Sequence, residues 1–174
     1  VLIAKVYFEQ SYNDFFPDKE RIYMIISNYS TSDGSMPYGQ TPGGVPVGMK
    51  AEIPDIEVAT RYTWLAWSGT VVTTDRKKYT GQVILGDSCL FDIFPRTVLA
   101  GNVKDVLSRP MYAMVSKKIA EKMGGVGQAI GQTFYIDSRP GKIVTIGGVF
   151  EDIPNNSHLT YDVIISMSSI GQFM

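Results

Sequence analysis

The order in which short apolar segments follow one another most constrains the fold of this chain. Segments with helical spacing alternate irregularly with segments of β-type composition, without a βαβ rhythm and without an internal repeat. A parallel, doubly wound sheet requires a regular alternation of strands and helices, so the pattern argues against that class. The sequence therefore predicts an α+β fold with mixed or antiparallel sheets.

Helices are predicted where apolar residues recur at helical spacing, and strands where β-branched or alternating runs occur. We expect helices at residues 1–16, 45–53, 87–94, 104–107 and 116–123, and a last one from Ser166 onward. We expect strands at residues 22–26, 56–64, 70–74, 79–85, 111–115, 133–136, 142–150 and 161–165. The strands at 70–74 and 79–85 flank a charged turn, which predicts a hairpin, and residues 30–44 have the composition of a loop.

The composition indicates a folded domain with no affinity for nucleic acid. Hydrophobic residues make up 44% of the chain and charged residues 19%, below the ~25% of an average soluble domain. A chain with this balance can bury a core, so intrinsic disorder is not expected. The 16 Lys and Arg residues are balanced by 17 Asp and Glu residues. Because this leaves no basic excess to neutralise a phosphate backbone, we expect no nucleic-acid partner.

The sequence predicts neither a metal nor a cofactor. Cys89 is the single cysteine and His158 the single histidine, so a disulfide within the chain and a usual zinc site are both excluded. No G-x-x-x-x-G-K-[ST] phosphate loop is present. The apolar stretches fall far below the ~18 residues of a membrane helix. Because the sequence opens on Val1 rather than Met, we expect a piece of a longer protein.

Two short motifs resemble reactive sites but fit structural roles better. Residues 125–131 read G-V-G-Q-A-I-G, with Ile130 where a dinucleotide-binding loop needs glycine, and they follow a helix instead of a strand. Ser157 and His158 are neighbours in sequence, which rarely places a hydroxyl and its base in attack geometry, and no G-x-S-x-G turn occurs. We expect a glycine-rich loop at the first motif and a loop histidine at the second.

The remaining reactive side chains also favour structural roles. Cys89 lies in an apolar run with no second histidine to pair with, which is typical of a small buried hydrophobe. Glu151 and Asp152 would point to opposite faces of a strand, so a turn or surface position is favoured over an acid and base pair. The sequence thus predicts no catalytic residue and no enzyme.

Two groups of residues are candidates for contact with a partner. Tyr62, Trp64 and Trp67 could line a groove for a ligand, although core packing is favoured for them. The loop at 30–44 could become ordered on binding a partner, and plain disorder explains its composition equally well. The candidate contact residues are Met36, Pro37, Tyr38, Trp64 and Trp67.

Several stretches along the chain carry a family resemblance in their order and spacing. The most specific is S-Y-N-D-F-F-P-D-K-E-R-I-Y at residues 11–23, followed by P-D-I-E-V-A-T-R at 54–61 and D-S-C-L-F-D-I-F at 87–94. Further matches run through residues 99–133 and end on G-V-F-E-D-I-P-N-N-S-H-L at 148–159. Taken together, they resemble the MacB-like periplasmic core domain of FtsX-like permeases of ABC transporters, in its Bacteroidetes-type form.

This resemblance implies a place in the cell and a domain division. The domain would be inserted between the first and second transmembrane helices of a permease, and would face the periplasm from the inner membrane. The helix at 1–16 would continue the first membrane helix outward. Residues 1–67 and 140–174 would form a membrane-proximal, porter-like α+β subdomain, and residues 68–139 an inserted, hairpin-rich, sabre-like subdomain.

The resemblance also implies a function without catalysis. In this family the ATPase is a separate cytoplasmic domain or subunit, which agrees with the missing phosphate loop. The domain would couple ATPase-driven motion to a periplasmic adaptor or cargo protein, in export or in envelope signalling, within a permease dimer. The alternative is a free-standing periplasmic module that binds a peptide or a lipid in an aromatic groove near Trp64 and Trp67.

Overall fold

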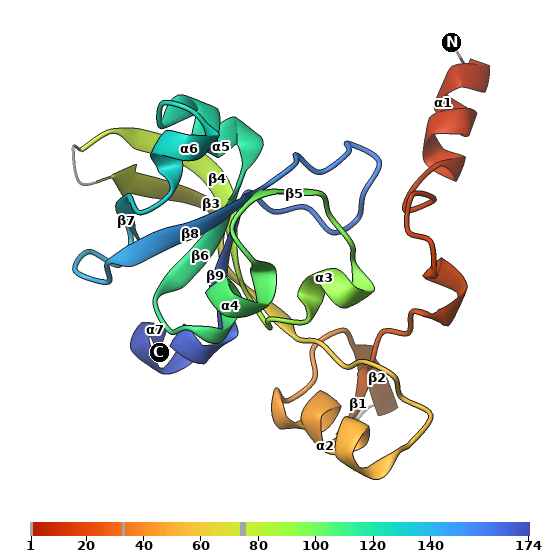
Figure 1. Cartoon of the computed structure of the whole chain (residues 1–174). Helices are drawn as coiled ribbons and strands as arrows, with labels where there is room; N and C mark the ends of the chain where they lie inside the picture. The colour runs from red at the N-terminus through yellow and green to blue at the C-terminus, as the bar shows by residue number, and fades with distance from the viewer. Residues whose placement is uncertain (1, 33, 74–75) are drawn as a thin grey trace.

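The structure, a computed structural model, describes residues 2–32, 34–73 and 76–174. Its N-terminal part lies to one side of the main sheet (Figure 1). This part comprises α1 (Leu2–Gln10), the 3-10 helix η1 (Lys19–Arg21), the antiparallel strands β1 (Ser27–Thr31) and β2 (Gly34–Tyr38), and α2 (Gly44–Glu52). We refer to residues 22–60 as the hairpin unit. Every described side chain of this unit is at least partly exposed to solvent.

The rest of the chain forms a seven-stranded mixed sheet in the order β5-β8-β6-β9-β4-β3-β7. Its strands are β3 (Tyr62–Thr73), β4 (Lys78–Gly86), β5 (Val98–Ala100), β6 (Tyr112–Ser116), β7 (Thr133–Ile136), β8 (Val144–Phe150) and β9 (Val163–Ser166). The pairs β4–β9 and β6–β8 are parallel, whereas the other pairs are antiparallel. Because β7 also pairs with β8, the sheet closes on itself.

Short helices cover the closed sheet. They are α3 (Leu90–Ile93), α4 (Val103–Ser108), α5 (Lys117–Lys122), α6 (Val126–Ala129), the 3-10 helix η2 (Met167–Ser169) and α7 (Ile170–Phe173). In Figure 1, α5 and α6 lie together at one end of the sheet, and α7 carries the C-terminus at the other. Among the described residues, no helix combines the length and the apolar character needed to cross a membrane.

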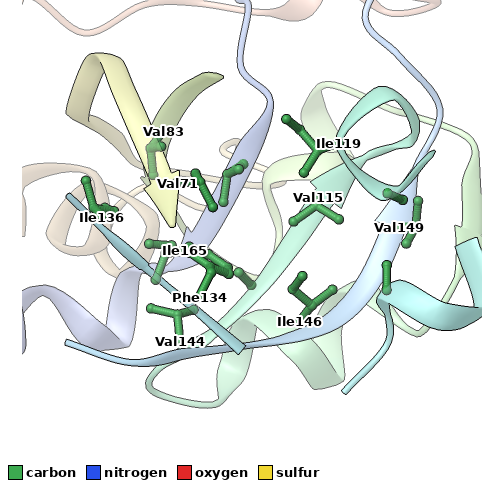
Figure 2. Packing of buried hydrophobic residues seen from close by; sticks show 14 of the residues in the cluster. Val71, Val83, Val115, Ile119, Phe134, Ile136, Val144, Ile146, Val149 and Ile165 are labelled. Atoms are coloured by element: carbon green, nitrogen blue, oxygen red, sulfur yellow. The ribbon is translucent and has the colours of Figure 1, made fainter. Parts of the chain in front are cut away.

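Side chains on both faces of these strands are buried, so the strands lie between two hydrophobic cores. We call the one enclosed by the closed sheet the inner core and the one next to α3 and α4 the outer core. Alternate residues such as Val83, Val115 and Ile165 point into the closed sheet, where Phe134 and Ile146 pack with them (Figure 2). The residues between them, such as Ile84, Met114 and Ile164, point outward and pack against α3 and α4. The apolar runs of these strands are continuous because side chains on both faces are buried.

The predicted α+β class with mixed and antiparallel sheets is confirmed. The hairpin at 70–85 is β3–β4, and the helix predicted at 45–53 is α2. The later strands and helices also lie close to their predicted positions. The expected division into residues 1–67 with 140–174 and residues 68–139 stays a prediction; strands of the one closed sheet come from both parts.

Four local predictions from the first 64 residues are wrong. Residues 22–26 form no strand, and Tyr23 is 85% exposed, because this segment has no neighbouring strand to pair with and the ladder begins only at Ser27. Residues 30–44 are not one loop, since they contain the end of β1 and all of β2. The strand predicted at 56–64 begins only at Tyr62, and the helix predicted at 1–16 ends at Gln10.

The two-faced packing predicts a sharp contrast between two isoleucines near the start of β8. Ile146 is 1% exposed inside the closed sheet, whereas Ile143 is 56% exposed. We expect Ile146→Ala to lower the free energy of unfolding by about 2–5 kcal/mol, because it removes buried surface and leaves a cavity. The matched control Ile143→Ala should change it by no more than about 0.5 kcal/mol. Urea denaturation followed by circular dichroism measures both, and equal losses would contradict this packing.

Candidate functional site

The end of α1 is bound to a loop from the opposite end of the chain. The Asn13 backbone N–H donates to the Asn156 carbonyl (2.9 Å), and the Asn156 side-chain amide donates to the Ser11 carbonyl (2.8 Å). The His158 backbone N–H donates to the Asn13 side-chain oxygen (3.1 Å), while the Asn13 amide nitrogen lies 2.8 Å from His158 Nδ1. We call residues 11–13 and 156–158 the clasp. Its side-chain hydrogen bonds join residues that are 145 positions apart in sequence.

The clasp determines which nitrogen of His158 carries its proton. Because the Asn13 side-chain oxygen accepts from the His158 backbone, the amide NH₂ of Asn13 faces Nδ1. Nδ1 must therefore accept, which places the proton of the neutral imidazole on Nε2. The Tyr12 ring packs against the imidazole, with centroids 4.6 Å apart, and also contacts Phe8 of α1. A chain of aromatic contacts thus connects α1 to the loop.

The backbone of Asn13 explains both the turn that follows α1 and the choice of residue. Asn13 has φ = 61°, in the left-handed region, where Asn is tolerated far better than most residues. A residue in this conformation cannot continue a right-handed helix, so the chain turns away from the helix axis here. The turn directs the Asn13 side chain onto the loop at 156–158.

A second contact lies directly after the clasp. Phe16 is 4% exposed and packs against Phe94, with ring centroids 5.3 Å apart. The Arg96 guanidinium lies 4.9 Å from the ring centroids of both Phe15 and Phe16, which is cation–π geometry. The N-terminal segment is therefore held by hydrogen bonds at residues 11–13 and by aromatic packing at residues 15–16.

The loop that carries the clasp is itself fixed to the closed sheet. After β8, the Glu151 carboxylate pairs with Lys117 (3.2 Å), and the Asp152 carboxylate accepts from the backbone N–H of Lys118 (2.9 Å) at the start of α5. Asp162 lies before β9, accepts from the Gln82 backbone (2.8 Å) and pairs with Lys118 (2.6 Å). Asp152 thus accepts a hydrogen bond at the start of α5, where the Ser116 side chain makes no cap bond.

An ion pair fixes the hairpin unit to the closed sheet. Arg61 donates through Nε and Nη2 to the two carboxylate oxygens of Asp87 (2.9 and 2.8 Å), and through Nη1 to the Gly43 carbonyl (3.0 Å). The hydrogen bond to Asp87 raises the pKa of the Arg61 guanidinium. Bidentate pairs of this kind fix orientation as well as distance. Arg61 therefore links Gly43 of the hairpin unit to Asp87 at the end of β4.

The residues predicted to contact a partner lie on different elements of the fold. Met36, Pro37 and Tyr38 are exposed on β2, where the Tyr38 ring packs edge-on against Tyr29 of β1 at 5.4 Å. Trp64 lies on β3 and packs against the outer core, as core packing predicts. Trp67 also lies on β3, but its side chain is outside the described part of the chain. The structure thus separates the hairpin residues from Trp64.

The other residues considered for chemistry have structural contacts. The Ser157 hydroxyl donates to the Leu159 carbonyl (2.9 Å), and Cys89 is partly exposed with its thiol directed at the Ala59 carbonyl (3.3 Å), not fully buried as expected. In the glycine-rich loop, Gly125 and Gly131 have positive φ angles, as a structural loop requires. Within the described residues, no cluster of His, Cys, Asp and Glu could hold a metal ion.

Comparisons with known proteins agree with this architecture. The family model of the MacB-like periplasmic core domain matches residues 2–174. A solved permease domain from Porphyromonas gingivalis has 30% sequence identity and a TM-score of 0.74, over 88% of this chain and 67% of that one. No curated protein matches the chain.

Two more distant solved structures share the fold alone. The extracellular domain of the ABC-type transporter YknZ from Gram-positive bacteria has 17% identity and a TM-score of 0.57, over 75% of this chain and 64% of that one. The periplasmic region of MacB from Actinobacillus actinomycetemcomitans has 12% identity and a TM-score of 0.50, over 75% and 63%. This chain thus spans about two thirds of the solved domains that it resembles.

The chain belongs to the family of MacB-like periplasmic core domains. It is a periplasmic domain of a MacB-like ABC transporter permease, as its sequence motifs indicate. The clasp unites the first and last of those motifs, since residues 11–13 belong to one and residues 156–158 to the other. Sequence reasoning identified both motifs but missed their contact, because no local pattern relates positions so far apart.

The clasp predicts a graded response to substitution of Asn13. Asn13→Gly keeps the left-handed backbone and removes the side-chain bonds, so we expect it to lower the free energy of unfolding by about 1–2 kcal/mol. Asn13→Ala should lower the free energy of unfolding by about another 1 kcal/mol, because Ala is strained at positive φ. Urea denaturation measures both variants. Equal stability of the Gly and Ala variants would contradict the left-handed conformation.

Alkaline pH provides a separate test of the buried hydroxyl beside Arg96. Burial raises the pKa of Tyr161 to about 12, partly opposed by Arg96. The folded state therefore retains this proton when the unfolded state loses it, so stability should fall as the pH rises from about 10 to 12. The loss attributable to Tyr161 should be on the order of 2 kcal/mol. Tyr161→Phe should remove this component in urea titrations across that range, and an unchanged slope would contradict the burial.

Proposed function

We propose that this domain couples the motion of a cytoplasmic ABC ATPase to a periplasmic adaptor or cargo protein, in export or in envelope signalling. In this proposal α1 continues the first membrane helix of the permease, in the inner membrane, and carries displacement into the periplasm. The domain itself performs no catalysis and binds no cofactor. Two permease copies would form the working transporter, so that the ATPase acts on both domains.

The clasp is the observation that carries this proposal. A helix can transmit displacement only to the element that it is fixed to, and the end of α1 is fixed at the β8–β9 loop. That loop is joined to α5 by Asp152 and Asp162, and to β4 by the bond between Asp162 and the Gln82 backbone. Displacement of α1 therefore reaches the closed sheet through hydrogen bonds and ion pairs, without passing through the hairpin unit.

The exposed hairpin is the proposed contact surface for the periplasmic partner. Met36 is 65% exposed and Tyr38 is 47% exposed, and Pro37 lies between them on β2. Aromatic and methionine side chains are enriched at protein interfaces. Arg61 would hold this surface in a fixed orientation to the moving sheet. In this proposal Trp64 and Trp67, which lie on β3, are not part of this surface.

A free-standing periplasmic module that binds a peptide or a lipid is the alternative. Exposed aromatic side chains of the hairpin unit, such as Tyr23 and Tyr29, are compatible with such binding. Tight binding of a peptide or lipid by the isolated chain, measured by isothermal titration calorimetry, would favour this alternative. No binding, together with a loss of transport when the domain is deleted from the permease, would favour coupling.

Coupling predicts that a broken clasp separates ATP hydrolysis from transport. In the full-length permease with its ATPase, we expect Asn13→Gly to lower export or signalling output by roughly tenfold, since it removes both side-chain hydrogen bonds of Asn13. ATP hydrolysis by the same complex should continue. The matched control is Asn155→Gly, in the same loop and exposed, which should leave both activities unchanged.

Two results would contradict the proposal. One is full output from a permease that carries Asn13→Gly at normal abundance in the membrane. The other is full output after deletion of the entire domain. Membrane abundance should be measured by immunoblot in each case, because a marginal loss of stability can reduce the amount of protein several-fold.

A further inference from the structure

The segment between η1 and β1 is an apolar stretch of backbone without a neighbouring strand. Residues 22–26 read I-Y-M-I-I, and the chain is extended at Ile22, with φ = −93° and ψ = 121°. Tyr23 is 85% exposed and Met24 is 72% exposed. Within the described residues, the backbone N–H groups of residues 23–25 donate no hydrogen bond. The segment therefore has the composition of a strand and begins in an extended conformation, but its N–H groups are unpaired.

Contacts at its two ends hold this segment in position. Directly before it, Arg21 forms an ion pair with Glu57. Near its end, the Thr41 hydroxyl donates to the Ile25 carbonyl (3.1 Å) and lies 3.2 Å from the hydroxyl of Ser27, the first residue of β1. An incoming strand would thus meet a backbone that is already positioned, which lowers the entropic cost of pairing with it.

The segment lacks the features that protect open strand edges in soluble proteins. Such edges carry Lys or Pro, or are interrupted by bulges, because unpaired N–H groups on an apolar edge allow pairing with other chains. Residues 22–26 contain no charged residue and no proline. A two-stranded sheet such as β1–β2 is also only marginally stable by itself. We therefore expect a permanent neighbour, since a transient partner would leave this edge open whenever it dissociates.

The solved relatives contain enough additional chain to supply that neighbour. The match to the Porphyromonas gingivalis permease domain uses 88% of this chain but covers only 67% of that domain. The matches to the YknZ and MacB domains cover 64% and 63% of them. About a third of each solved domain thus lies outside its match to this chain. Since a strand takes only about 5–6 residues, this additional length is ample.

We propose that a further segment of the same permease chain, from the part of the domain outside this match, adds as a strand beside residues 22–26. The added strand accepts hydrogen bonds from the N–H groups on that edge and covers Tyr23 and Met24. Residues 22–26 then become the first part of a longer β1, and the two-stranded sheet gains a third strand. The inference does not depend on the proposed coupling function, because it concerns how the hairpin unit is completed.

Photo-crosslinking in the full-length permease identifies what lies beside the segment. Tyr23 is replaced by p-benzoylphenylalanine, which reacts with neighbouring C–H bonds on irradiation, and mass spectrometry identifies the crosslinked peptides. We expect a product with the mass of one permease chain, in which residue 23 is joined to a peptide from outside residues 1–174. The matched control is the same replacement at Ile143, which is 56% exposed directly before β8 and should give no crosslink to that peptide.

Hydrogen exchange in the full-length permease measures whether the neighbour pairs with the backbone. We expect at least one amide among residues 23–25 to exchange about 100-fold or more slowly than in an unstructured peptide. Not all of them should slow, since only alternate N–H groups point toward a given neighbour. Met24→Lys should restore fast exchange, because a charge on the edge opposes strand addition. The control Ile143→Lys should leave the slow exchange unchanged.

Other results overturn the inference. A product with the mass of two chains, joining residue 23 to another copy, would mean that the segment is a contact between permease copies. A crosslink to a separate protein would mean that the edge is kept open for that partner. A crosslink within the chain but with fast exchange would mean that the neighbour covers the segment without pairing. The absence of any crosslink to a same-chain peptide outside residues 1–174 would exclude the proposed neighbour at any exchange rate.

Discussion

The pairing of β8 with strands on both of its edges is the constraint on which the rest of the structure depends. One edge of β8 pairs with β6, and the other pairs with β7 near its start and with β5 near its end. These pairings close the sheet and enclose the inner core. They also fix where the chain emerges after Phe150, and hence the position of the loop that binds the end of α1. The geometry of the clasp therefore depends on the closure of the sheet.

The sequence predicted the parts of the fold whose signal is local. The runs at 83–85 in β4, 113–115 in β6 and 163–165 in β9 are apolar without a break because both of their faces are buried. The helix α2 has Pro46 in its first turn and Pro54 after its end. Residues 22–26 have the same β-type composition but no strand beside them, so the strand predicted from their composition does not form. Whether such a run becomes a strand depends on a neighbour that the run itself does not encode.

The clasp could be predicted only in part, for a related reason. Its residues were recognised as members of two family motifs, and His158 was correctly predicted to be a loop residue. Their contact depends on the left-handed turn at Asn13 and on the path of the β8–β9 loop. Hydrogen bonds between residues 145 positions apart leave no periodic trace in either segment. The first and last motifs therefore supply the two halves of the clasp.

The exposure of the hairpin unit has a consequence for how domains of this family diverge. None of its described side chains is buried, whereas the closed sheet has two filled cores. Substitutions at exposed positions usually change stability little, while those in the cores are severely restricted. The hairpin can therefore acquire new side chains by mutation without unfolding the sheet or loosening the clasp. Under the proposed function, recognition of different partners would change on this unit while the clasp and the closed sheet stay the same.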